Sequence, residues 1–170
     1  MMKVSILFIA ILLLRPPASG QLTLNSPDYK ALTLLVNNID DLKNDPVFQK
    51  YTTHQKKNIY YNVKGVAINY LTMRQKFWID TNKRYNTELK DVPEKSEFNL
   101  YCITDSARLH IARGDLIISL FQPSYFHGYY YVMAYARNDA STYGDHISHF
   151  LFILNRRLKV VKCLYLKGLI

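Results

Sequence analysis

Apolar residues recur at helical spacing in the first part of the chain. Ser26 followed by Pro27 is typical of a helix start, and the pattern over residues 29–42 predicts an amphipathic helix. Pro46 follows the end of this pattern and favours a short second helix through residues 48–51. The apolar positions that define the first helix are Leu32, Leu35, Val36 and Ile39.

A longer stretch over residues 57–80 predicts the strongest helix. Its apolar positions lie three or four residues apart, as on one helix face. Gly65 is its weakest position, since glycine costs a helix about 1 kcal/mol relative to alanine. We expect Trp78, near the end of the stretch, in the core. The apolar face comprises Ile59, Val63, Val66, Ala67, Tyr70, Leu71, Phe77 and Trp78.

After Pro93 apolar residues recur at every second position, which predicts β-strands. Breaks at Gly114, at residues 122–124 and at residues 138–141 separate the strands, and residues 155–157 form the last turn. The predicted strands cover residues 98–102, 109–111, 115–121, 128–137, 146–154 and 158–166.

This order of elements predicts an α+β fold, with N-terminal helices packed on one face of a C-terminal antiparallel sheet of five or six strands. We expect a single domain over residues 21–170, since about 150 residues suit one core. Cystatin-like proteins share this layout, but their Gln-x-Val-x-Gly hairpin and later Pro-Trp pair are absent from the sequence. The sequence therefore indicates no family.

The first 20 residues have the three zones of a cleavable secretory signal peptide. Lys3 gives a positive start, residues 4–14 are an unbroken apolar run, and Ala18 and Gly20 form a small-residue cleavage site. The apolar run is too short for a membrane span, which needs about 20 residues. We therefore expect a secreted, extracellular protein that starts at Gln21 and has no membrane span.

Basic residues outnumber acidic ones by 22 to 13, and two of the bases lie in the leader. The excess is concentrated in residues 50–95 and in residues 154–170, and the second of these segments has no acidic residue. Such a surface favours an anionic partner: a heparan-type glycan, an acidic protein or an acidic membrane. Nucleic acid is compatible with this charge, but no motif supports it. The candidate binding residues of the C-terminal segment are Arg156, Arg157 and Lys159.

Two cysteines follow the leader, Cys102 and Cys163. An even number of cysteines in an oxidising compartment predicts one disulfide bond between them. Closing a loop of about 60 residues stabilises a fold by roughly 4 kcal/mol in the chain-entropy model.

The densest aromatic segment, residues 125–135, is predicted to form a hairpin. Strand alternation gives its second strand two distinct faces, and we expect the face with the smaller residues to pack against the helices. That face comprises Tyr130, Val132 and Ala134, and its expected contacts are Val63, Val66 and Tyr70. The other face is the candidate binding surface and comprises Tyr129, Tyr131, Met133 and Tyr135, of which we expect the three tyrosines to be exposed.

Five histidines raise the question of metal binding or acid–base chemistry. His146 and His149 point to opposite faces of a strand, and no spacing offers the three or four converging ligands of a zinc site. We therefore expect neither a metal nor a cofactor. A nuclease-type active site needs two histidines and a cation on one sheet face, and its candidates are His110, His146, His149 and Lys162.

These features favour a secreted, basic, non-enzymatic binding protein. Its binding surface is the Tyr-rich hairpin, and the basic segments guide a protein, an anionic glycan or a small ligand to it. Two alternatives stay open. One is a small secreted hydrolase of nuclease type. The other is a protease inhibitor with a cystatin-like layout, which inserts the loop at residues 122–124 into a protease cleft.

Overall fold

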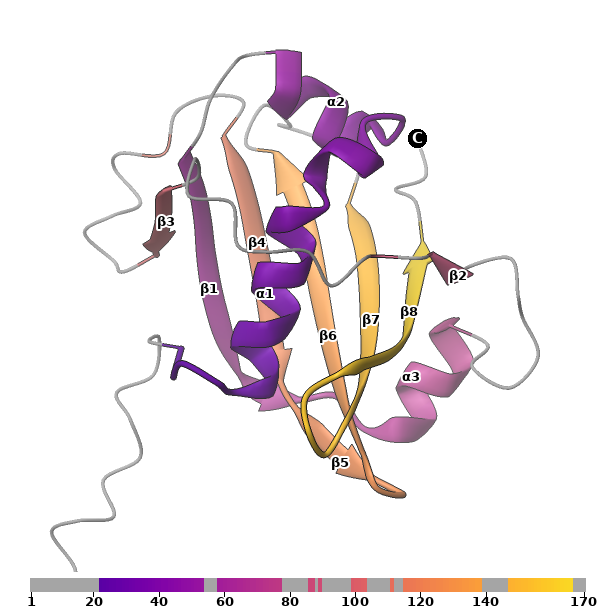
Figure 1. Cartoon of the computed structure of the whole chain (residues 1–170). Helices are drawn as coiled ribbons and strands as arrows, with labels where there is room; N and C mark the ends of the chain where they lie inside the picture. The colour runs from indigo at the N-terminus through magenta and orange to yellow at the C-terminus, as the bar shows by residue number, and fades with distance from the viewer. Residues whose placement is uncertain are drawn as a thin grey trace, which may run out of the picture.

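The computed structural model describes residues 22–53, 58–77, 86–87, 89, 99–103, 111, 115–138 and 147–166. The helices in these residues are α1 (Pro27–Asn37), the 3₁₀ helix η1 (Ile39–Leu42), α2 (Pro46–Thr53) and α3 (Tyr70–Phe77). The strands are β1 (Asn58–Ala67), β2 (Asn86–Thr87), β3 (Asn99–Cys102), β4 (Leu116–Gln122), β5 (Ser124–Phe126), β6 (Tyr129–Asn138), β7 (Ser148–Asn155) and β8 (Val160–Leu166). Figure 1 shows α1 crossing in front of the sheet and α3 behind it.

The strands of the described residues form one eight-stranded sheet in the order β2-β8-β7-β6-β4-β1-β3, with β5 paired to β6. β4, β6, β7 and β8 are antiparallel neighbours, as the alternating pattern predicts. β1, however, lies parallel to both β3 and β4. The fold is therefore α+β, but its sheet is mixed and larger than the predicted antiparallel sheet of five or six strands.

The first helix begins where the sequence predicts. The Oγ atom of Ser26 accepts a hydrogen bond from the backbone N–H of Tyr29 at 3.2 Å, and Pro27 occupies the first turn. α1 and α2 both contact β4 and β6. Burying each apolar side chain between these layers contributes about 1.5–3 kcal/mol. This core includes Leu32, Leu35, Ile39, Phe48, Ile118, Val132, Phe150 and Phe152.

Residues 58–77 do not form the single helix that the spacing predicts. They form β1 and then, after two connecting residues, the short helix α3. Ile59 packs beneath α1, while its neighbour Tyr60 is only 7% exposed on the opposite face. Only these two residues of β1 are buried, and its last four residues are exposed. Without a regular alternation of apolar and polar residues, the apolar positions of β1 match helical spacing by coincidence. Val66 is 67% exposed rather than part of an apolar face, and Trp78 lies outside the described residues.

The separation of α3 from β1 changes which tyrosines are exposed. Met73 of α3 is 1% exposed and packs against the sheet face that points away from α1. Tyr131 lies beneath this helix and is 7% exposed, so the expectation that it is exposed is wrong. The ring of Tyr70 meets that of Tyr131 edge-on at 5.3 Å between centres. The apolar cluster under α3 comprises Met73, Tyr131, Met133, Leu151, Ile153 and Leu164.

On the face of β6 that points toward α1, burial follows the predicted strand alternation. Val132 and Ala134 are buried on the α1 side of the sheet, as predicted. Of the residues expected against them, Val63 packs on the same cluster. Val66 is exposed and Tyr70 lies on the opposite face with α3, so these two expected contacts are wrong.

Asp45 joins the N-terminal helices to the last strands. Its Oδ1 atom accepts a hydrogen bond from the backbone N–H of Val47 at 2.8 Å, and its backbone carbonyl accepts one from Gln49, so Asp45 caps α2. Its Oδ2 atom accepts hydrogen bonds from the hydroxyls of Ser148, at 2.5 Å, and Tyr165. Burial, together with the Asp45 carboxylate, raises the pKa of Tyr165.

The predicted disulfide bond is wrong, because both Cys102 and Cys163 are free thiols. Cys102 lies on β3 and Cys163 on β8, and β7, β6, β4 and β1 separate these strands. At about 4.8 Å between neighbouring strands, the two residues are roughly 24 Å apart. A disulfide bond needs Cα atoms within about 7 Å of each other. Burial raises the pKa of both thiols, which lowers their reactivity.

Several predicted features lie outside the described residues. These are the leader at residues 1–20 and, except for Ile111, the strand at residues 109–111, together with His54, His110 and His146. Among the helices that the structure describes, none has the length and apolar composition needed to cross a membrane.

Candidate functional site

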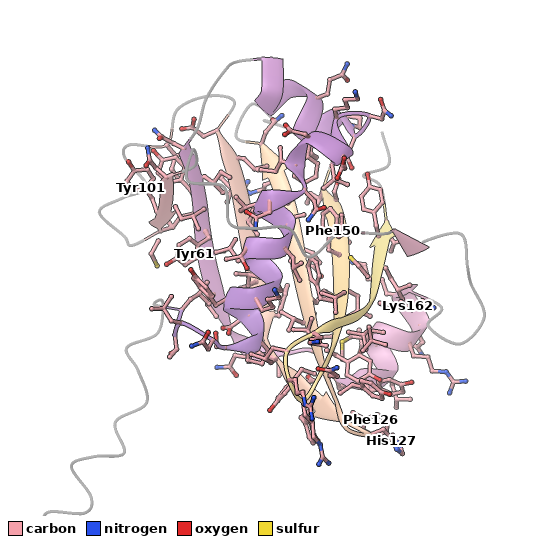
Figure 2. The ribbon with its side chains drawn as sticks, viewed as in Figure 1. Tyr61, Tyr101, Phe126, His127, Phe150 and Lys162 are labelled. Atoms are coloured by element: carbon pink, nitrogen blue, oxygen red, sulfur yellow. The ribbon has the colours of Figure 1, made fainter. Side chains whose placement is uncertain are left out.

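Two β-turns from separate hairpins meet at one end of the sheet. The first joins β5 to β6 through His127 and Gly128, whose φ angles are 47° and 84°. Two consecutive residues with positive φ are typical of a type I′ turn, whose twist matches that of the strands it joins. Phe126 and Tyr129 pair across this turn. Figure 2 shows Phe126 and His127 together at this end of the molecule.

The second turn joins β7 to β8, and Asn155 holds it in place. The Oδ1 atom of Asn155 accepts hydrogen bonds from the backbone N–H groups of Arg157 at 2.9 Å and Lys159 at 3.0 Å. The backbone of Asn155 bonds to Leu158 and Lys159, which closes the loop. Leu158 has a φ of 57°, a conformation that costs a non-glycine residue about 1–2 kcal/mol. The turn thus fixes the backbone that carries its two exposed arginines.

The two turns lie side by side because Tyr129 pairs with Asn155 between β6 and β7. Together they line an open pocket of about 580 Å³. We call this surface the basic tip, and it consists of His127, Gly128, Tyr129, Asn155, Arg156, Arg157 and Lys159. Three of these residues are permanent cations and none is acidic, so the pocket has a positive potential.

Exposed aromatic rings flank the basic tip. Tyr125 is 50% exposed, Phe126 is 39% exposed and Tyr129 is 38% exposed. The Nε atom of Arg156 donates a hydrogen bond to the Tyr125 hydroxyl at 2.7 Å, which uses one of the five guanidinium donors. Phe126 stacks on Tyr70 of α3 with 4.4 Å between ring centres. These contacts fix the positions of the rings next to the cations.

The basic tip brings together four of the six predicted binding residues, namely Tyr129, Arg156, Arg157 and Lys159. Tyr131 is buried beneath α3, and Tyr135 is half-buried farther along β6, so neither belongs to it. The sequence pattern did not single out His127 or Asn155. Two features of the sequence could have indicated these turns. One is a residue pair that ends in glycine between two aromatic strands, and the other is an asparagine at the start of a turn.

A second polar group lies on the sheet face that α3 covers in part. Four neighbouring strands each contribute one half-buried residue to a row across the sheet. We call it the polar row, and it consists of Asn62, Ser119, Tyr135 and His149. Two lysines reach this row: the Nζ atom of Lys64 lies 5.7 Å from the centre of the Tyr135 ring, and that of Lys76 lies 4.9 Å from it.

The polar row is partly shielded from solvent. Burial and, to a lesser degree, the Lys76 ammonium lower the pKa of His149 to about 4, so this histidine is neutral at pH 7. Burial also lowers the pKa of Lys76 and raises that of Tyr135. The ring of His149 meets that of Tyr135 edge-on at 4.4 Å. In such a setting charges interact more strongly than on an open surface.

The lowered pKa of His149 predicts a loss of stability in weak acid. In an unfolded chain the pKa of histidine is about 6.5, so between about pH 6.5 and pH 4 the unfolded state binds a proton that the folded state does not. The free energy of unfolding therefore falls as the pH falls through this window. We expect His149→Gln to flatten that dependence in urea denaturation curves. Equal pH slopes for wild type and H149Q would contradict this prediction.

The described residues do not assemble the nuclease-type arrangement. His149 and Lys162 share one sheet face, but His149 pairs with Leu166, about four residues along β8 from Lys162. That spacing is roughly 13 Å along the strand, and His110 and His146 lie outside the described residues. In the parts of the chain that the structure describes, no three His, Cys, Asp or Glu side chains gather as metal ligands do.

Residues 122–124, the expected inhibitory loop, form a bend between two strands instead. Gln122 ends β4, and Ser124 begins β5. The Oγ atom of Ser124 donates a hydrogen bond to the backbone carbonyl of Ile68 at 2.7 Å. The bend is thus held against the connection from β1 to α3, and the turn that ends this hairpin is the one at His127.

No protein-family model, curated protein or solved structure matches the chain, so no family is assigned to it.

Proposed function

We propose that the protein is a secreted binding protein whose basic tip recognises acidic glycans of the heparan type. One observation carries this proposal: two turns place Arg156, Arg157 and Lys159 beside exposed aromatic rings around one open pocket. The signal-like leader supports secretion. The excess of basic over acidic residues supports an anionic ligand.

The cations of the basic tip suit oxyanion groups such as sulfates and carboxylates. Each guanidinium presents its donors in a planar fork that matches a pair of oxyanion oxygens. The bonds from Arg157 and Lys159 to the Asn155 side chain fix the backbone that carries these cations. Binding therefore costs less conformational freedom than it would on a loose loop. None of the described residues that line the pocket is acidic, so none of them competes with the ligand for the cations.

The aromatic rings favour a glycan over a simple counter-ion. Tyr125, Phe126 and Tyr129 present flat apolar surfaces beside polar hydroxyls. A sugar ring likewise has an apolar face and a polar rim, so it can lie on an aromatic ring while its charged substituents reach the cations. An open pocket suits a long chain that continues past the site, whereas enclosed cavities suit small molecules.

Replacing Arg156, Arg157 and Lys159 together by glutamine is expected to weaken binding to immobilised heparin by about 10- to 100-fold, because each exposed ion pair contributes up to about 1 kcal/mol. Binding of the wild type should also weaken steeply with salt, since electrostatic interactions are screened beyond about 8 Å at physiological ionic strength. Dissociation constants from surface plasmon resonance and the salt concentration at elution measure both effects.

A matched control removes the same charge from other surfaces by replacing Lys30, Lys43 and Arg137 with glutamine. We expect this variant to bind heparin nearly as well as the wild type. Tyr129→Ala keeps every charge and removes one exposed ring, so it tests the aromatic contribution, which we expect to be about fivefold or more. Equal losses in the two triple variants would show that heparin responds only to net charge, and would overturn the proposal.

A further inference from the structure

The polar row is separate from the basic tip. Tyr135 lies about 20 Å along β6 from Tyr129, on the face that α3 partly covers. Two lysines from different elements converge there, Lys64 from β1 and Lys76 from α3. Besides its approach to Tyr135, the Lys64 ammonium lies 5.1 Å from the centre of the Phe121 ring.

Lys64 and Lys76 place two positive charges beside one aromatic ring. Both lie within 6 Å of the centre of the Tyr135 ring, and Lys76 is half-buried whereas Lys64 is exposed. Like charges at one site repel each other, and the partial burial of Lys76 strengthens this repulsion. Among the residues that the structure describes, neither Lys64 nor Lys76 has a carboxylate within ion-pair distance. The faces of Tyr135 and Phe121 offer only the partial charges of aromatic rings. An anion that contacts both ammonium groups would offset their repulsion.

Asn62, in the same row, lacks a hydrogen-bond donor for its side-chain oxygen among the described residues. Its Oδ1 atom is buried and has no hydrogen-bond donor in the described structure. Such buried polar atoms are rare in folded proteins, because they have lost water without gaining a partner. Asn62 and Lys64 are two positions apart on β1, so their side chains share one face about 7 Å apart. A ligand that satisfies both residues carries a negative charge and a hydrogen-bond donor.

We propose that the polar row, together with Lys64 and Lys76, binds a small phosphate-type oxyanion that carries a hydroxyl group. The charged oxygens of the ligand lie between the two ammonium groups, and the hydroxyls of Ser119 and Tyr135 donate hydrogen bonds to them. The O–H group of the ligand donates to Oδ1 of Asn62. The neutral His149 closes one end of the row.

Inorganic phosphate at about pH 6.5 is the probe, because it still carries O–H groups there, and sulfate, which has none, is the comparison anion. Each is titrated into the ¹⁵N-labelled protein, and NMR follows the backbone amides of Lys64 and His149. We expect saturable shifts with phosphate and weaker binding of sulfate. Asn62→Leu should abolish this preference, because it removes the acceptor for the O–H group of phosphate.

The lysines are tested by K64Q/K76Q, which should bind phosphate at least about tenfold more weakly than the wild type. If the double variant does not fold, Lys76→Gln alone, on α3, still tests the role of the lysines, and it should also weaken phosphate binding. The variant with glutamine at Arg156, Arg157 and Lys159 should bind phosphate at the polar row normally. The absence of saturable shifts, phosphate affinity that K76Q leaves unchanged, or sulfate binding as tight as phosphate binding would each overturn the proposal.

Discussion

Replacing Asp45 by alanine is expected to lower the free energy of unfolding by about 3–5 kcal/mol. The substitution removes the cap of α2 and the acceptor for the hydroxyls of Ser148 and Tyr165. Ser148 is fully buried, so water cannot replace the carboxylate that its hydroxyl loses. The N-terminal helices thereby lose their polar connection to β7 and β8. Urea denaturation followed by circular dichroism measures the change.

Two further variants separate the contributions of the Asp45 carboxylate. Asp45→Asn keeps an oxygen that can cap α2, so we expect a smaller loss of about 1–2 kcal/mol. In a Ser148→Ala/Tyr165→Phe background both hydroxyl donors are gone, and Asp45→Asn should then cost less than it does in the wild type. If Asp45→Asn had the same effect in both backgrounds, the proposed link between α2 and the last strands would be contradicted.

Replacing Phe150 by alanine is expected to destabilise the fold by about 3–5 kcal/mol, because it opens a cavity at the centre of the core. Phe150 is fully buried. Its ring lies 6.0 Å from that of Phe48, 5.0 Å from that of Tyr165 and 6.2 Å from that of Phe152, measured between centres. It therefore joins α2, β7 and β8 in one aromatic cluster. Thermal and urea denaturation both report this loss.

Phe150→Leu preserves most of the volume and should cost only about 1–2 kcal/mol, so it stays measurable if the alanine variant does not fold. Tyr129→Ala removes a ring of similar size from the exposed basic tip, and we expect its effect on stability to be within about 1 kcal/mol. Similar losses for Phe150→Ala and Tyr129→Ala would show that the core is not centred on Phe150.

The sequence predicts those elements that have a clear start or break signal and a regular apolar pattern between such signals. The start of α1 at Ser26 and Pro27 and the strands β4, β6, β7 and β8 all lie where the pattern places them. β1 fails because its apolar and polar residues do not alternate: Ile59 and Tyr60 are buried on opposite faces, the last four residues are exposed, and the apolar positions match helical spacing by coincidence. Once β1 and α3 are merged into one helix, nothing is left to cover Tyr131, and its burial cannot be foreseen.

The candidate sites depend on pairings between distant segments, and local patterns do not contain this information. The charge of residues 154–170 indicates basic binding residues, but only the pairing of Tyr129 with Asn155 brings them beside the aromatic hairpin. The polar row is still less visible, because its members come from four strands and their order in the sheet differs from their order in the sequence. The predicted disulfide bond fails for the same reason, since strand order decides which cysteines can meet.

The parallel pairing of β1 also determines the order in which the sheet can assemble. β6, β7 and β8 follow one another along the chain, so their pairings close only short loops. β1 pairs with β4 through residues such as Ile59 and Leu116, and ordering the long intervening segment makes this contact slow to form. The C-terminal meander is thus the part of the molecule that can fold first. Until β1 docks, β4 is an open edge, and the nascent protein is most prone to aggregate through that strand.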